Sequence, residues 1–224
     1  MTDRELAGML DQTLLKAYAS ADDMEKFCKT AAEYGFAMVA INSVQTVRCK
    51  KLLKDSEVHV GAAIGFPLGQ QTIEVKAYET AEAIEQGADE IDYVINIGEL
   101  KNKNYEYIED EMRTIVDLCR ENCVISKVIF ENCYLTDDEK KKMCEIALKV
   151  RPDFVKTSTG FGTGGATLED VRLMKECVGD EIGVKAAGGI RNLDTALAFI
   201  EAGATRIGTS AGVEIVEEYK NIGK

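Results

Sequence analysis

Short apolar runs alternate with longer amphipathic stretches from one end of the chain to the other. Runs rich in β-branched residues predict strands at 9–12, 37–42, 58–65, 90–97, 124–130, 154–157, 182–187 and 205–208. Apolar positions at helical spacing predict helices over 21–34, 75–86, 105–120, 137–150 and 168–178. Thr136 stands where a helix N-cap belongs, and Gly35 stands where a left-handed residue ends a helix.

The repeated strand–helix unit predicts the fold class. Eight such units in 224 residues are typical of a (β/α)8 barrel, an α/β fold, and we also expect a short N-terminal helix. A doubly wound open sheet is the alternative, but no GxGxxG motif follows the first predicted strand to support it. Because no linker-like stretch divides the chain, we expect one barrel domain over residues 1–224.

Composition narrows the classes of partner and compartment. The net charge of −12 argues against nucleic-acid binding, so we expect a small-molecule partner, and any anionic ligand needs a local site. The seven cysteines include no CxxC pair, which favours free thiols and a cytoplasmic location. The N-terminus is acidic where a signal peptide would be basic, and no apolar run could span a bilayer, so we expect no membrane partner.

Charged residues fall on the predicted inner faces of several strands. Strand alternation directs Asp92, Lys127, Lys156 and Lys185 into the barrel. An ammonium group inside an apolar strand costs free energy unless its charge is removed or used. The pair formed by Lys156 and Lys185 therefore indicates amine chemistry and an enzyme. The alternative is a buried Lys–Asp ion pair with a purely structural role.

Glycine-rich turns follow the last two predicted strands. Gly188-Gly189 and the segment 208–212 open short loops into helices, where bare N–H groups can bind a phosphate. Ser210 could add a hydroxyl donor and Arg191 a charge at the rim. Alternation does not determine which way Arg206 points.

Other reactive residue types receive no catalytic role. His59 is the only histidine, so a metal site is not expected and we interpret the side chain as structural. No histidine lies beside any cysteine in the sequence, which argues against a nucleophilic thiol. The charged runs 140–143 and 217–220 are typical of solvated helix faces.

These motifs resemble the 2-deoxyribose-5-phosphate aldolases, class I aldolases that work through a lysine Schiff base. The resemblance covers nearly the whole chain and is carried by segments 11–15, 64–69, 87–98, 127–131, 155–167, 184–191 and 206–210. It implies reversible cleavage of 2-deoxy-D-ribose 5-phosphate to D-glyceraldehyde 3-phosphate and acetaldehyde, without metal or cofactor. A related aldolase with another phosphorylated aldose or aldehyde donor, and a non-catalytic phosphosugar-binding barrel, remain as alternatives.

The resemblance also assigns roles to residues. It implies that Lys156 is the Schiff-base lysine and that Asp92 and Lys185 are its acid/base partners. Contacts to substrate or phosphate are expected from Asp11, Thr13, Thr159, Gly160, Gly188, Gly189, Arg191, Gly208 and Ser210. A nucleophilic lysine needs a lowered pKa, and we expect the charge of Lys185 to lower that of Lys156. The sequence does not fix the oligomeric state, for which a homodimer is the candidate.

The chain departs from the family pattern at a few positions. The differences are Gln12 for histidine, Ala40 for cysteine, Ser43 for proline and Ala211 for a second serine. None of them removes a catalytic group. The chain also ends without the terminal tyrosine that some relatives use to protonate the enamine, so we expect Asp92 and water to serve that step.

Overall fold

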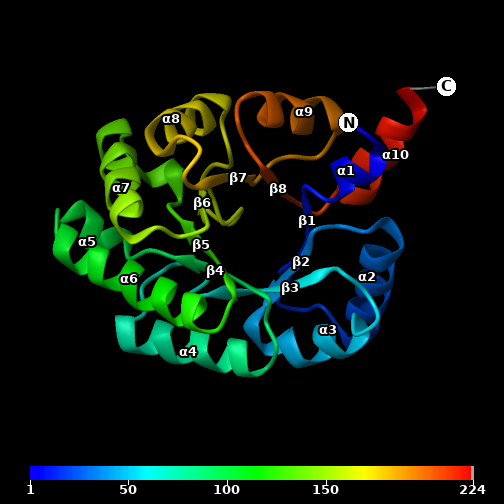
Figure 1. Cartoon of the computed structure of the whole chain (residues 1–224), viewed down its shortest axis with the longest axis horizontal. Helices are drawn as coiled ribbons and strands as arrows, with labels where there is room; N and C mark the ends of the chain where they lie inside the picture. Colours follow the sequence, from blue (N-terminus) through cyan, green and yellow to red (C-terminus); the bar gives the residue numbers. More distant parts are fainter. Residues whose placement is uncertain (223–224) are drawn as a thin grey trace.

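Eight parallel strands close into a barrel in the order β1 to β8, with the helices outside it (Figure 1). The computed structural model describes residues 1–222, so the predicted domain limit at residue 224 lies outside the described residues. The strands are β1 Leu10–Leu14, β2 Met38–Asn42, β3 His59–Ile64, β4 Glu90–Val94, β5 Ile125–Ile129, β6 Phe154–Lys156, β7 Gly183–Ala187 and β8 Arg206–Thr209. The predicted barrel is confirmed, and the open-sheet alternative is wrong.

The helices cover the outside of the barrel (Figure 1). They are α1 Asp3–Ala7, α2 Ala21–Tyr34, α3 Thr46–Leu52, α4 Ile73–Glu85, α5 Ile97–Lys101, α6 Tyr105–Glu121, α7 Asp137–Val150, α8 Leu168–Val178, α9 Leu193–Glu201 and α10 Gly212–Ile222. Two 3-10 turns, Ser43–Gln45 and Asn132–Tyr134, complete the loops. The short predicted N-terminal helix is α1. Among residues 1–222, no helix combines the length and the apolar character needed to cross a bilayer.

Local sequence signals explain where the elements begin and end. Thr136 caps α7 in a capping box with Glu139, and Gly35 ends α2 with φ of 67°. The fourth strand is shorter than predicted, because the Asn96 side chain accepts a hydrogen bond from the Glu99 N–H and starts α5. The predicted strand 90–97 therefore ends at Val94.

Strand register brings the charged residues together inside the barrel. Asp92 on β4 is the register partner of Lys127 on β5, and Lys156 on β6 is the partner of Lys185 on β7. The opposite face of most strands is largely apolar and packs under the helices, as Ile91 does on β4 with none of its surface exposed. The helices thus bury the apolar face of the sheet and leave the inner face for polar chemistry.

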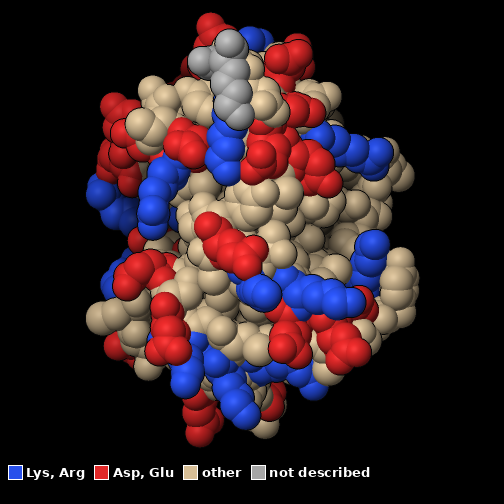
Figure 2. Space-filling view, turned by 90° about the vertical axis from the view of Figure 1, so that its right-hand side faces the viewer, with Lys and Arg blue, Asp and Glu red and all other residues tan. Residues whose placement is uncertain are grey.

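The face of the molecule shown in Figure 2 carries charges of both signs. On the face shown in Figure 2, acidic and basic side chains are interspersed among uncharged ones. The net charge of −12 therefore does not form a single acidic field on this face.

Candidate active site

A cavity of about 200 Å³ opens at the carboxyl ends of the barrel strands. This is the end of the barrel where enzymes of this fold carry their reacting groups. Its wall contains nine of the residues predicted as site residues: Thr13, Lys156, Thr159, Gly160, Gly188, Gly189, Arg191, Gly208 and Ser210. The remaining three, Asp11, Asp92 and Lys185, lie buried beneath this wall.

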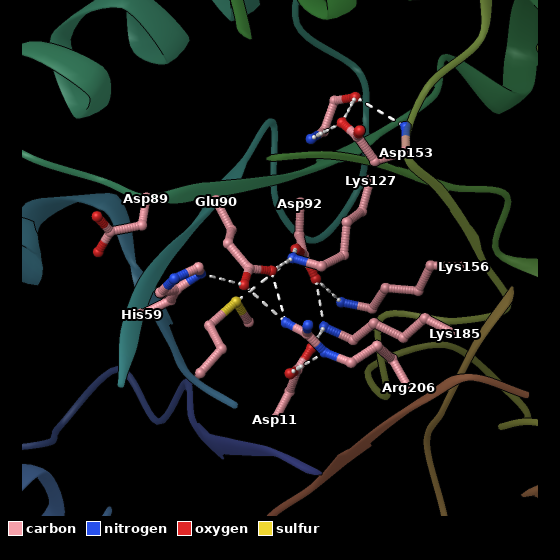
Figure 3. A network of polar contacts seen from close by, with 12 residues as sticks. Asp11, His59, Asp89, Glu90, Asp92, Lys127, Asp153, Lys156, Lys185 and Arg206 are labelled. Atoms are coloured by element: carbon pink, nitrogen blue, oxygen red, sulfur yellow. Dashed lines mark hydrogen bonds and ion pairs between the residues drawn. The ribbon is translucent and has the colours of Figure 1, made fainter. Parts of the chain in front are cut away.

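Asp92 is the centre of the buried polar contacts (Figure 3). Its Oδ2 atom accepts hydrogen bonds from Lys156 Nζ and Lys185 Nζ, each at 2.7 Å. Its Oδ1 atom accepts another from Lys127 Nζ at 2.7 Å. Because the Nζ atoms of Lys156 and Lys185 share one oxygen, they can be separated by no more than twice that distance. The predicted inward direction of all four side chains is confirmed.

Asp11 and Arg206 extend the cluster below Lys185 (Figure 3). Lys185 Nζ lies 2.6 Å from Asp11 Oδ2, and Arg206 Nε donates to Asp11 Oδ1 at 2.8 Å. Arg206 therefore points inward, which the sequence pattern left open. Asp11 was predicted to contact substrate, but the structure places its carboxylate between two buried cations, where it supports Lys185.

Glu90 closes the cluster at the amino-terminal end of the barrel. It accepts a hydrogen bond from Arg206 Nη2 at 2.7 Å and forms an ion pair with Lys127. His59 Nδ1 lies 2.8 Å from Glu90 Oε1, and this hydrogen bond raises the pKa of His59. His59 thus contacts the network through Glu90, at the amino-terminal end of the barrel.

The buried cluster holds one more cation than it holds carboxylates. Its acidic members are Asp11, Glu90 and Asp92, and its basic members are Lys127, Lys156, Lys185 and Arg206. An unbalanced charge away from water is costly, so the cluster favours loss of one proton. Of the four cations, only Lys156 belongs to the cavity wall.

The pKa of Lys156 is lowered, as expected for a buried cluster with an excess of cations. Burial is the main cause that lowers the pKa of Lys156 to about 8, with repulsion from Lys185 acting in the same direction against attraction by Asp92. The expectation that Lys185 supplies the lowering is therefore only partly right, because burial contributes more. At pH 7 about a tenth of such lysines are neutral and nucleophilic.

Asp92 stays ionised in spite of its burial. Burial by itself would raise the pKa of Asp92, but the attraction of Lys127, Lys156 and Lys185 outweighs it and holds that pKa well below its usual range. Asp92 is therefore a carboxylate in the folded protein, and a carboxylate can accept a proton from a neighbouring lysine or water.

The glycine loops after β7 and β8 form the other end of the cavity. Gly188 and Gly189 adopt φ of 90° and 83°, which side-chain-bearing residues rarely do. Thr209 ties the loops together by donating to the Ile190 carbonyl at 2.7 Å. Gln12, which departs from the family pattern, braces the second loop by accepting from Gly212 N at 3.0 Å and donating to the Ser210 carbonyl at 3.4 Å.

Two neighbours of the cavity were missed by sequence reasoning. Phe161 lines the cavity and packs edge to face against Phe66, with ring centroids 5.4 Å apart. Glu131 follows β5 in the left-handed region, with φ of 57°, and its carboxylate contacts Thr159. Two signals were present in the sequence: both residues lie in segments that carry the family resemblance, and Glu131 stands just after a predicted strand. Within residues 1–222, no group of three or more His, Cys, Asp or Glu is placed to bind a metal.

A closed barrel whose carboxyl-terminal face holds a buried lysine with a lowered pKa is the arrangement expected of a lysine-dependent enzyme. Sequence comparison identifies the family. The chain belongs to the DeoC/LacD family of aldolases, whose pattern matches residues 6–218.

Individual relatives agree with the family assignment. The chain is 59% identical over 216 residues to the deoxyribose-phosphate aldolase of Lactobacillus acidophilus, covering 96% of this chain and 91% of the relative. It is 55% identical over 219 residues to that of Thermococcus kodakarensis, covering 97% and 98%.

Solved structures give the same result. A structure described as QR15, an aldolase, superimposes with a TM-score of 0.92 at 39% identity and 96% coverage of both chains. The tetrameric deoxyribose phosphate aldolase of Aeropyrum pernix superimposes with a TM-score of 0.92 at 33% identity, covering 99% of this chain and 93% of that one.

Proposed function

We propose that this protein is a class I aldolase that reversibly cleaves 2-deoxy-D-ribose 5-phosphate to D-glyceraldehyde 3-phosphate and acetaldehyde. The observation that carries the proposal is Lys156, a cavity-lining lysine whose pKa is lowered to about 8 and whose Nζ shares Asp92 with Lys185. The names of the most similar relatives supply the substrate.

The first half of the reaction forms the Schiff base. Neutral Lys156 attacks the C1 carbonyl of the open-chain sugar, and the carbinolamine then loses water to give an iminium ion. Lys185 donates the proton on which water leaves the carbinolamine, and Asp92, which accepts a hydrogen bond from Lys185 Nζ, relays the proton that the attacking amine gives up. No metal or cofactor is needed, because the iminium itself withdraws electrons from the sugar.

The second half breaks the C2–C3 bond. A base removes the C3 hydroxyl proton, the bond electrons pass to the iminium as an enamine, and glyceraldehyde 3-phosphate leaves. Asp92, directly or through a water, accepts that proton, because it is anionic and contacts Lys156 Nζ at 2.7 Å. Asp92 and water then return a proton to the enamine carbon, and hydrolysis of the iminium releases acetaldehyde and Lys156.

The cavity wall positions the substrate so that its C1 carbonyl lies next to Lys156. Gly188, Gly189, Gly208 and Ser210 offer backbone and hydroxyl donors to the phosphate, and Arg191 adds a charge at the rim. On the other side, Thr13, Thr159 and Gly160 face the sugar. Asp11 acts through Lys185 and not on the substrate itself.

The remaining properties follow from the sequence and the relatives. We propose that residues 1–224 act as one aldolase domain in the cytoplasm and assemble as a homodimer. Because the Aeropyrum pernix relative is a tetramer, the mass of the assembly in solution decides between a dimer and a higher oligomer.

Borohydride trapping tests the proposed chemistry. Acetaldehyde and borohydride should leave a stable adduct on Lys156, located by peptide mass spectrometry, and 2-deoxyribose 5-phosphate should be cleaved. An adduct on Lys185 or Lys127 would contradict the assignment of Lys156. No adduct at any lysine would favour a non-catalytic phosphosugar-binding barrel. An adduct on Lys156 with faster turnover of another phosphorylated aldose would change the substrate and keep the mechanism.

A further inference from the structure

Glu131 is a buried carboxylate at the catalytic end of the barrel that the mechanism above does not use. It lies two residues beyond the end of β5, only 2% of its surface is exposed, and its backbone adopts φ of 57° and ψ of 61°. A left-handed conformation is unfavourable for a residue with a long side chain and persists only where surrounding contacts hold it. The Glu131 carbonyl accepts the Tyr134 N–H at 3.1 Å and Cys133 Sγ lies 3.9 Å from Oε1, but the main contacts of the carboxylate are with the loop that follows Lys156.

The carboxylate of Glu131 binds the start of this loop at two points. Its Oε1 accepts a hydrogen bond from the Thr159 N–H at 3.2 Å, and its Oε2 accepts one from the Thr159 hydroxyl. The loop packs closely against it, since a Cβ atom at Gly162 would lie 2.8 Å from Cys133 Sγ and 3.2 Å from Glu131 Cδ. Thr159 is part of the cavity wall together with Lys156.

These contacts fix the direction of the Thr159 hydroxyl. Its single hydrogen is donated to Glu131, and one of its lone pairs accepts the Phe161 N–H at 3.0 Å. A hydroxyl oxygen has two lone pairs, so one acceptor position is left. Burial raises the pKa of Glu131, whereas the hydrogen bonds from Thr159 favour its ionised form, which can only accept.

We propose that Glu131 is a positioning residue that makes Thr159 a hydrogen-bond acceptor for a hydroxyl group of the phosphosugar bound to Lys156. Acting through Thr159, it holds the sugar in the orientation that bond cleavage requires. This inference rests on the proposed function, because it needs a polyhydroxylated substrate.

Glu131→Gln tests the inference while keeping both hydrogen bonds to Thr159. The glutamine oxygen can still accept the Thr159 N–H, and its amide group can donate to Thr159 Oγ1. The loop keeps both hydrogen bonds, but the Thr159 hydroxyl can no longer donate to position 131. Its hydrogen then points toward the substrate, so Thr159 offers a donor where it had offered an acceptor. We expect kcat on 2-deoxyribose 5-phosphate to fall by about ten- to a hundredfold. Trapping of Lys156 by acetaldehyde, which carries no hydroxyl group, should stay at the wild-type level.

Asp153→Asn is the matched control. Asp153 Oδ2 accepts hydrogen bonds from the N–H and the hydroxyl of Ser126, both at 2.8 Å, so it makes the same pair of contacts. It precedes β6 and therefore lies at the opposite end of the barrel from the cavity. Asp153→Asn should reverse the Ser126 hydroxyl in the same way and leave kcat unchanged.

A double-mutant cycle with Thr159→Val completes the test. If Glu131 acts through Thr159, the double variant should be no slower than Thr159→Val alone. Additive losses, a wild-type kcat in Glu131→Gln, or an equal loss of acetaldehyde trapping would each overturn the inference. Should Glu131→Gln fold poorly, comparing Thr159→Val with Thr159→Ser tests the acceptor directly, because only serine keeps a hydroxyl that Glu131 can orient; equal kcat values for the two would overturn the inference. If the wild-type protein did not cleave 2-deoxyribose 5-phosphate, the proposed function would fail. If the wild type cleaved it and only the variants departed from expectation, the inference about Glu131 alone would fail.

Discussion

At the scale of single residues, the lowered pKa of Lys156 comes mainly from burial, to which an excess of buried cations adds. The cluster around Asp92 contains one cation too many, and the cavity lies next to Lys156. Burial is the main cause of the lowered pKa, because it disfavours the charged form of the amine. Lys185 adds like-charge repulsion, since its Nζ contacts the same Asp92 oxygen as Lys156 Nζ does. Like-charge repulsion and burial thus favour the same neutral amine.

Lys185→Leu should reverse part of this effect. Without Lys185 the cluster is balanced with Lys156 protonated, so the pKa of Lys156 should rise above about 8, by about one unit or more. Schiff-base formation should slow at pH 7 and recover in part as the pH rises. The pH dependence of borohydride trapping measures this, with Lys185→Arg as the charge-keeping control. A profile that is unshifted but scaled down would show that Lys185 acts by proton transfer or positioning.

At the scale of elements, the site depends on where strands end and loops begin. The loops after β7 and β8 are held by the Thr209–Ile190 hydrogen bond and by Gln12, so their glycines face the cavity in a fixed arrangement. Gly189 has φ of 83°, and a Cβ added there would meet no atom within 4 Å. A side chain at this position therefore disturbs the backbone and little else.

Gly189→Ala should weaken binding of the phosphate specifically. Strain of roughly 1–2 kcal/mol would turn the local N–H groups away from the anion, so KM for 2-deoxyribose 5-phosphate should rise roughly fivefold or more. KM for unphosphorylated deoxyribose should change little. Gly35→Ala is the matched control, because Gly35 has φ of 67°, has an equally open Cβ position and caps α2 away from the cavity. Equal losses on both sugars would contradict a phosphate role.

Sequence patterns predict elements better than they predict what loops do. Alternation placed Asp92 and Lys156 correctly, because a strand side chain can point only to one of two faces. Helices α3 and α5 were not predicted, since segments of seven and five residues give few periods to recognise. Helices were expected after the last two strands, where α9 and α10 lie, but no residue ranges were predicted for them. Neither the inward turn of Arg206 nor the clamp formed by Glu131 follows from periodicity, because each depends on partners more than 25 residues away in sequence.

At the scale of the whole molecule, the interior and the surface carry opposite charge. The protein has a net charge of −12, yet its buried cluster is built around an excess of cations. A dianionic sugar phosphate is thus repelled by the molecule in general and attracted only where the cavity opens above the lysines. The same cluster connects β1, β4, β5, β6, β7 and β8 through the centre of the barrel.

Because Asp92 joins three of these strands to β4, Asp92→Asn should destabilise the entire barrel as well as abolish turnover. Removing one partner of a buried ion pair leaves uncompensated charge, here three lysines around a neutral amide, which costs about 3 kcal/mol in free energy of unfolding at pH 7. Glu109→Gln is the control, since Glu109 pairs with Arg113 on the surface at 2.8 Å, and its loss should cost under about 0.5 kcal/mol.

The pH dependence of this loss has a definite sign. The pKa of Asp92 is lowered in the folded protein, so its stabilising contribution is fully present above the unfolded value of about 3.9. The contribution is lost as the pH falls further through the folded value. Urea unfolding at several pH values should therefore show a constant difference between wild type and Asp92→Asn from neutral pH down to about 4, and a shrinking difference below. A difference that grew on acidification would mean that Asp92 is protonated in the folded barrel, and its assignment as the proton acceptor would have to be withdrawn.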